Sequence, residues 1–177
     1  KKLELLSRWI RGNFFIPDAR KFWIQPSIKY LTKRLQKEPV DVIVSTGPPH
    51  SMHLIAKAIA KQTKTQWVAD FRDPWTNIDF YEDLQLTKAA NRKHHKLEKN
   101  VCEDANALIV IGPTMKSEFK EISPSTPIHV VPNGFDEADQ HVASTAALDA
   151  EFSIAHVGSC SPSRNVPHLW DALSELC

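Results

Sequence analysis

The sequence has 177 residues, enough for one ordinary domain and a little more. Hydrophobic residues make up 42% and charged residues 24%, a balance that excludes a disordered chain. The formal net charge is +1, so nothing in the composition indicates a nucleic-acid-binding protein. Three widely spaced cysteines, Cys102, Cys160 and Cys177, form no CxxC pair and are typical of a reducing cytoplasm, not of a disulfide framework or a zinc site.

The first 25 residues are aromatic and basic. Large aromatic side chains stand among Arg and Lys, at Trp9, Phe14, Phe15, Phe22 and Trp23. Such a segment is either a core helix whose cations extend to solvent or a surface that meets lipid headgroups. Because Gly12 and Pro17 interrupt a single long amphipathic helix, we expect the core arrangement. The lipid interpretation is the alternative.

Helical patterns then alternate with short runs rich in Val and Ile. Helices are expected over residues 27–37, 52–62, 87–104, 114–121 and 167–176. Strands are expected over residues 40–45, 66–71, 107–111, 128–131 and 152–157. Most of the strands are almost continuously apolar, as in parallel sheets that are buried on both faces. The pattern predicts an α/β fold, a Rossmann-like doubly wound and mostly parallel sheet with helices on both faces.

Residues 136–151 are acidic and small and show no aliphatic periodicity. We interpret them as an interdomain linker. It separates an N-terminal Rossmann-like domain (residues 1–135) from the first strand and helix of a second domain (residues 152–177). The sequence begins without Met and ends inside an expected helix, so we expect a fragment of a longer protein.

Ligands of open parallel sheets bind beyond the carboxyl ends of the strands, so the loops there are the candidate sites. After the first strand, Gly47 allows close backbone approach and His50 stands at the start of the next helix. An ordinary turn with an exposed His50 is the simpler interpretation, and His53 is expected to be structural. After the second strand come Asp70, Arg72 and Asp73, which either neutralise one another or bind sugar hydroxyls.

Two later loops are weaker candidates. Asn133 and Gly134 form a turn motif after the fourth strand. After the fifth, Gly158 and Ser159 with Arg164 precede a helix, an arrangement that can hold a diphosphate through backbone amides, a hydroxyl and the guanidinium. The adjacent His94 and His95 lie in a polar helix, and we expect a solvated face there, not a metal site.

Together and in order, these segments resemble bacterial family 4 (group 1) glycosyltransferases, which have the GT-B architecture. The resemblance rests on residues 41–51 (DVIVSTGPPHS), 70–75 (DFRDPW), 97–111, 131–136 (VPNGFD) and 156–164. Asn106 departs slightly from the usual pattern. The five motifs cover nearly the whole chain.

The resemblance implies two Rossmann-like domains that face each other across a cleft, with the acceptor bound mainly by the first and the donor mainly by the second. Candidate catalytic residues are Asp70 and His50. Acceptor-side residues are Gly47, His50, Arg72 and Asp73. The donor diphosphate would contact Gly158, Ser159 and Arg164. The interdomain hinge would contain Asn133 and Gly134. No metal ligands are expected, because the family commonly works without a metal and no DxD-like pair is placed to bind one.

The implied activity is retaining transfer of a sugar from a nucleotide-diphosphate sugar to a hydroxyl acceptor, in surface polysaccharide or glycolipid synthesis. The donor substrate is the nucleotide sugar and no separate cofactor is implied. The acceptor is a saccharide or a lipid-linked sugar. The expected location is the cytoplasm, and the aromatic, basic start raises the hypothesis of peripheral contact with the inner membrane.

Two alternatives stay open: a nucleotide-sugar 2-epimerase-like enzyme, and a non-catalytic binding protein on a decayed GT-B fold. The epimerases usually lack the D-x-R-D-P-W string, and the intact charged residues of the motifs disfavour decay. The upstream Gly-rich loop and the acidic E-x7-E region of the family are not in this sequence. The fragment by itself is therefore expected to be inactive.

Overall fold

The computed structural model describes residues 2–137, 149–158 and 165–176. The chain divides into two units, Lys1–Gly134 and Phe135–Cys177. Among the described residues, no helix has both the length and the apolar character needed to cross a membrane.

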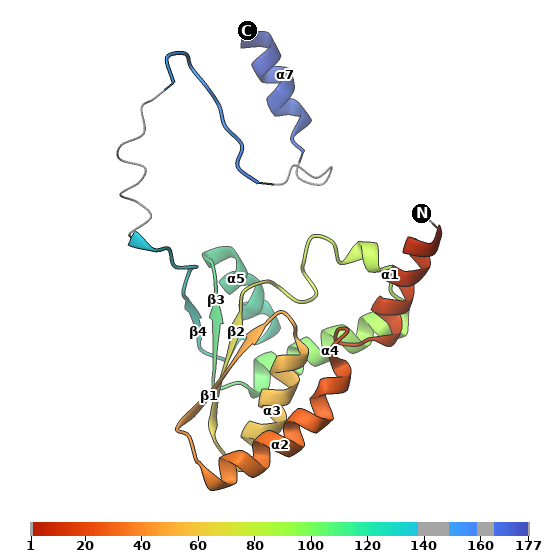
Figure 1. Ribbon diagram of the computed structural model, residues 1–177, viewed down its shortest axis with the longest axis vertical. Coiled ribbons are helices and arrows are strands. Elements are labelled where there is room, and N and C mark those ends of the chain that lie inside the picture. Colours follow the sequence, from red (N-terminus) through yellow and green to blue (C-terminus); the bar gives the residue numbers. More distant parts are fainter. Residues whose placement is uncertain (1, 138–148, 159–164, 177) are drawn as a thin grey trace. The chain divides into compact units, whose positions relative to one another are not determined.

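The first unit is built on a four-stranded parallel sheet (Figure 1). Its strands lie side by side in sequence order, as β1 (Val42–Gly47), β2 (Gln66–Phe71), β3 (Ala107–Val110) and β4 (Ile128–Val130). The register aligns the last residue of each strand with that of the next, from Gly47 to Phe71, Val110 and Val130. All four carboxyl ends therefore form one edge of the sheet. The predicted Rossmann-like α/β arrangement is confirmed.

Helices connect the strands close to the predicted positions. Before β1 come α1 (Lys2–Phe14), the 3-10 helix η1 (Lys21–Trp23) and α2 (Ile24–Lys37). The crossovers contain α3 (Ser51–Thr63), η2 (Glu82–Leu84) with α4 (Lys88–Asp104), and α5 (Pro113–Ile122). The long helix α4 begins where expected because the Thr87 hydroxyl accepts a hydrogen bond from the Ala90 N–H, satisfying a free amide of the first turn.

The core lies between these helices and one face of the sheet. In Figure 1, α2, α3 and α4 lie to the right of the strands. Side chains that alternate along the strands toward this side are fully buried, among them Trp67, Phe71, Leu108 and Val110, and they pack with Val101 of α4 and Phe119 of α5. On the other face of β1, Val42 and Val44 are 46% and 58% exposed. Among the described residues, β1 is thus buried on the helical side only.

Helix α1 does not form the core element expected for the aromatic, basic start. It packs through Gly12, which touches Leu84 and Leu86, and through Asn13, whose Oδ1 accepts the Thr87 N–H at 2.7 Å. Leu3, Leu6, Ile10 and Phe14 are exposed. The core interpretation is wrong for these side chains, because α1 meets the domain through Gly12 and Asn13 and not through its apolar stripe.

The second unit contains helix α7 (Pro167–Leu176), as predicted. The strand predicted over residues 152–157 is not formed, and the side chains of Phe152 and Val157 are 92% and 96% exposed. A β-strand is stabilised by pairing with neighbouring strands, and no described residue pairs with this segment. The apolar composition of residues 152–157 was therefore not sufficient to predict a strand.

Candidate functional site

The candidate site lies at the carboxyl edge of the sheet, where the loops after β1, β2 and β4 meet. Its centre is Arg72, the first residue after β2. The Arg72 backbone N–H donates to the Gly47 carbonyl oxygen at 2.9 Å, which ties the end of β2 to the end of β1. Because parallel strands end at the same edge, three loops that are distant in the sequence come together there.

Arg72 pairs with Asp70 in a forked geometry. Its Nε lies 2.9 and 3.0 Å from the two carboxylate oxygens, and its Nη2 lies 2.5 Å from Oδ1. Asp70 is only 8% exposed, so its charge depends on this partner. The hydrogen bonds with Asp70 raise the pKa of Arg72, which stays a cation at any working pH.

The same guanidinium reaches the loop after β4. Arg72 Nη1 donates to the Val131 carbonyl oxygen and to Asn133 Oδ1, each at 3.2 Å. The structure thus brings together Gly47, Asp70, Arg72 and Asn133. Asp73 is exposed and, within the described part of the chain, has no hydrogen-bond or ion-pair partner.

Two histidines lie beside this cluster, and both are buried. The His50 ring is 9% exposed and stacks on Trp75, with ring centroids 4.6 Å apart and planes 3° apart. His53 is fully buried, and its Nδ1 shares a hydrogen bond of 2.8 Å with Ser45 Oγ. His53 is structural, as predicted, whereas His50 is not the exposed side chain of the simpler interpretation.

Burial sets the charge of both rings. Desolvation lowers the pKa of His50 to about 4 and that of His53 to about 3. Both rings are therefore neutral at pH 7, and His50 cannot supply positive charge to a phosphate. Among the described residues, His50 Nδ1 is buried and has no hydrogen-bond partner. With so low a pKa, His50 would be a weak general base.

A family model described as Glycosyltransferase Family 4 matches residues 4–139. The chain belongs to glycosyltransferase family 4. The matched range includes the first four sequence motifs and the whole carboxyl edge of the sheet. Membership supports a glycosyltransferase-like function in general. Neither the curated proteins nor the solved structures contain a match to the chain.

In this family 4 domain, Asp18 supports the candidate site, although no sequence motif pointed to it. Its Oδ2 accepts the backbone N–H of Ser51 at 2.7 Å, at the start of α3, and its Oδ1 accepts the N–H of Arg20 at 2.8 Å. Asp18 thereby fixes the helix start that carries His50, and its charge is favourable at a helix N-terminus. Only the fold brings this residue, 33 positions earlier in the sequence, to α3.

His94 corrects a second expectation. It is 4% exposed, so it does not belong to a solvated face, whereas its neighbour His95 is exposed. The Trp75 Nε1–H donates to His94 Nδ1 at 3.1 Å, and desolvation lowers the pKa of His94. Trp75 therefore links the two buried rings of His50 and His94.

The loop after the DPW motif is anchored by the buried Glu98. Its carboxylate accepts hydrogen bonds from the backbone N–H and the hydroxyl of Thr76.

Gly47 is required by this packing. A Cβ at this position would overlap His53 Nε2 and would lie 3.2 Å from His50 Nδ1. We therefore expect Gly47→Ala to lower the free energy of unfolding by about 1–3 kcal/mol, the usual cost of overpacking a rigid core. Urea denaturation checks this. Gly134→Ala is the matched control, because a Cβ there meets nothing within 4 Å, and a similar loss in both variants would contradict the packing argument.

The donor-side residues predicted from the sequence belong to the second unit. Gly158 has a φ of +139°, a backbone conformation that favours glycine. Ser159 and Arg164 lie outside the described residues. Among the residues that are described, no group of three or more His, Cys, Asp or Glu side chains could hold a metal ion.

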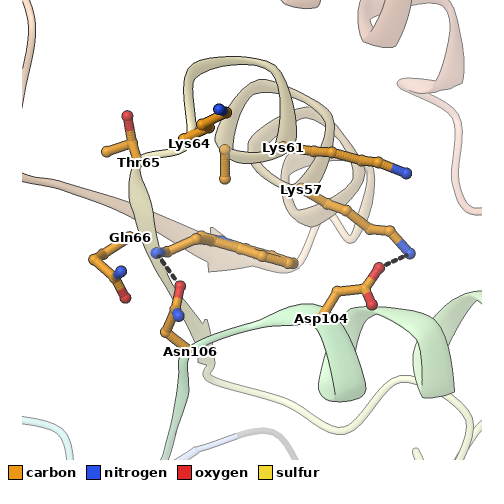
Figure 2. Close-up of a pocket in the computed structure, with 9 residues that line it drawn as sticks. Lys57, Lys61, Lys64, Thr65, Gln66, Asp104 and Asn106 are labelled. Atoms are coloured by element: carbon orange, nitrogen blue, oxygen red, sulfur yellow. Dashed lines mark hydrogen bonds and ion pairs between the residues drawn. The ribbon is translucent and has the colours of Figure 1, made fainter.

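A pocket of about 380 Å³ lies at the other end of the sheet, beside the amino end of β2 (Figure 2). Lys57, Lys61 and Lys64 line it together with Asn106 and Asp104, and Lys57 Nζ pairs with Asp104 at 2.7 Å. None of the predicted site residues lines this pocket. The candidate site of the family 4 domain is therefore separate from this pocket.

Proposed function

We propose that the full-length protein transfers a sugar from a nucleotide-diphosphate sugar to a hydroxyl acceptor with retention of configuration. The observation that carries the proposal is the position of Arg72, which binds Asp70 and also reaches Asn133 and the Gly47 carbonyl. A buried carboxylate in a charge-assisted network, at the edge where α/β domains bind ligands, is suited to orienting a hydroxyl group.

On the acceptor side, the proposal assigns Asp70 to orient the acceptor hydroxyl, with Gly47, His50, Arg72 and Asp73 around it. His50 is neutral at pH 7 and would contribute a hydrogen bond, not a charge. The candidates for a general base are Asp70 and His50. Asn133 and Gly134 would form the hinge between an N-terminal domain (residues 1–135), with its linker (136–151), and a donor-binding domain that begins at residue 152.

On the donor side, the proposal assigns Gly158, Ser159 and Arg164 to the diphosphate. The leaving diphosphate accumulates negative charge, which Arg164 and loop amides would stabilise without a metal ion. The proposed setting is surface polysaccharide or glycolipid synthesis in the cytoplasm. A lipid-linked acceptor would place the protein at the inner face of the membrane.

Product analysis tests the proposed reaction. The full-length protein would be incubated with UDP-, GDP- and ADP-sugars, with and without saccharide and lipid-linked acceptors. Formation of a glycoside whose anomeric configuration by NMR matches that of the donor supports the proposal. An epimerised sugar formed without acceptor would identify an epimerase instead. Binding of a nucleotide in a thermal-shift assay without turnover of any substrate would indicate a non-catalytic binding protein.

Arg164→Ala should lower kcat/KM for transfer by an amount equivalent to about 2–4 kcal/mol of transition-state stabilisation. The loss is expected because the guanidinium would neutralise charge that develops on the diphosphate. Steady-state kinetics of the full-length variant, together with the thermal shift caused by the nucleoside diphosphate, checks it. Unchanged turnover and unchanged nucleotide binding would remove Arg164 from the donor site.

A further inference from the structure

The apolar side chains of α1 form a stripe that faces solvent. Leu3, Leu6, Ile10 and Phe14 recur at helical spacing, and their side chains are 82%, 53%, 39% and 59% exposed. A surface helix normally turns its apolar stripe toward the core. In α1 the domain instead meets the small residue Gly12, so the exposed stripe needs another explanation.

The 3-10 helix η1 extends this stripe with two exposed aromatic rings. Phe22 is 68% exposed and Trp23 is 57% exposed. Lys21 joins them to the end of α1, because its Nζ hydrogen-bonds to the Phe14 carbonyl oxygen and lies 4.8 Å from the Phe22 ring centroid. The Arg20 guanidinium lies 5.4 Å from the ring centroid of Trp23. We call this set, Leu3, Leu6, Ile10, Phe14, Phe22 and Trp23, the α1–η1 surface.

The charges around the α1–η1 surface are mostly positive. Between residues 2 and 38 the sequence has nine cations and three acids: Lys2, Arg8, Arg11, Arg20, Lys21, Lys29, Lys33, Arg34 and Lys37 against Glu4, Asp18 and Glu38. The carboxylate of Asp18 is occupied, since both of its oxygens accept backbone N–H groups. The whole chain carries a net charge of only +1, so the basic residues are concentrated in this segment.

We infer that the α1–η1 surface docks the protein on a membrane that contains anionic phospholipid. Exposed aliphatic and aromatic side chains can enter the region between headgroups and acyl chains, while the surrounding Arg and Lys pair with anionic headgroups. Aromatic rings next to cations are typical of such interfaces, because the ring is apolar and the cation reaches the headgroups. A second copy of the chain fits less well, since it would bring two sets of like charges together.

This inference rests on the proposed function in one respect: docking on the membrane would bring the candidate site to a lipid-linked acceptor. Binding to vesicles is measured without turnover, so the two proposals can fail separately. Loss of transfer with intact vesicle binding would leave the docking surface in place. Transfer to a soluble acceptor without vesicle binding would overturn the docking surface and leave the proposed function in place.

Vesicle co-sedimentation of the full-length protein tests the inference. We expect binding to vesicles of phosphatidylcholine with phosphatidylglycerol and little binding to phosphatidylcholine alone. Phe22→Ser with Trp23→Ser should abolish sedimentation. These side chains are exposed, so the variant should keep its melting temperature and its transfer to a soluble acceptor. Equal sedimentation of the wild type and this variant would overturn the inference.

Charge reversal supplies a second variant with a matched control. Arg11→Glu with Arg20→Glu should weaken binding by roughly tenfold or more, since each cation near the surface contributes to attraction. Lys61→Glu with Lys64→Glu makes the same change in net charge beside the other end of α4. His94 contacts the Gly12 carbonyl and Asp104 lines the lysine pocket, which places the two regions about 15 Å apart along the helix axis.

The control variant should still sediment with the vesicles. Equal losses in the two charge variants would show attraction by net charge alone and would overturn the inference. Size-exclusion chromatography adds a last check. If the wild type is a dimer that Phe22→Ser with Trp23→Ser converts to a monomer, the surface binds a second copy and not lipid.

Discussion

Replacing Arg72 by alanine in the full-length protein should lower sugar transfer by roughly a hundredfold, the effect expected when a reacting group is misplaced by about 1 Å. It should also lower the free energy of unfolding by about 2 kcal/mol. The substitution leaves the carboxylate of Asp70, which is 8% exposed, without its forked partner. Breaking a fully buried pair costs about 3–5 kcal/mol, and the smaller value applies because Arg72 is partly exposed.

Steady-state kinetics and urea denaturation measure the two effects. Arg72→Lys should restore stability more than activity, because an ammonium group keeps the charge but cannot bind Asp70 in the forked geometry and also reach Asn133. Arg34→Ala is the matched control, since Arg34 pairs with Glu38 on the exposed surface of α2 and should change neither quantity by much. Full activity in Arg72→Ala would show that the loop cluster is structural only.

Acidification should destabilise the domain already above the pH at which free carboxylates titrate. The folded pKa of His50 is about 4 and that of His53 about 3, against 6.5 for the free side chain. Below pH 6.5 the unfolded chain binds protons that the folded chain does not, so stability is full above that pH and falls below it. Each histidine contributes about 1.4 kcal/mol per pH unit. Two of them remove about 4 kcal/mol by pH 5, a large part of a typical domain's stability.

Neighbouring groups modify this profile in known directions. The pKa of His94 is lowered mainly by burial, so this ring adds to the loss of stability. Burial raises the pKa of Glu98, which therefore opposes the loss once the pH falls low enough for that carboxyl to take up its proton. Asp18 favours the charged form of His50 and reduces its shift.

Urea denaturation at a series of pH values measures the slope. His50→Gln should reduce this slope of the free energy of unfolding against pH, because the variant has lost the contribution of one buried histidine. His95→Gln is the matched control, because His95 is exposed on α4 beside the buried His94, and its profile should follow the wild type. A wild-type stability that does not change between pH 7 and pH 5 would contradict the desolvation of these rings.

The order and type of most elements could be predicted from the sequence, because they follow from local periodicity. Strands β1 to β4 carry their own apolar runs, and α3, α4, α5 and α7 carry helical spacing. The loops of the candidate site could be predicted for a related reason. In a parallel sheet each strand has one carboxyl end, so the position of Asp70 and Arg72 after β2 already placed them at the ligand-binding edge. Their assigned roles remain proposals.

The burial of individual side chains could not be predicted from the sequence, because it depends on residues that are distant in the sequence and meet only in the tertiary structure. His94 stands in a polar helix, yet it is buried because Trp75 and the Gly12 carbonyl cover it. Asp18 caps α3 only because the chain passes that helix on its way to η1. Helix α1 contacts the domain through Gly12, and its apolar stripe is exposed. Residues 152–157 do not form a strand, because no described strand pairs with them. The sequence thus determined the elements and their loops, and the packing between distant segments decided which side chains lose contact with water.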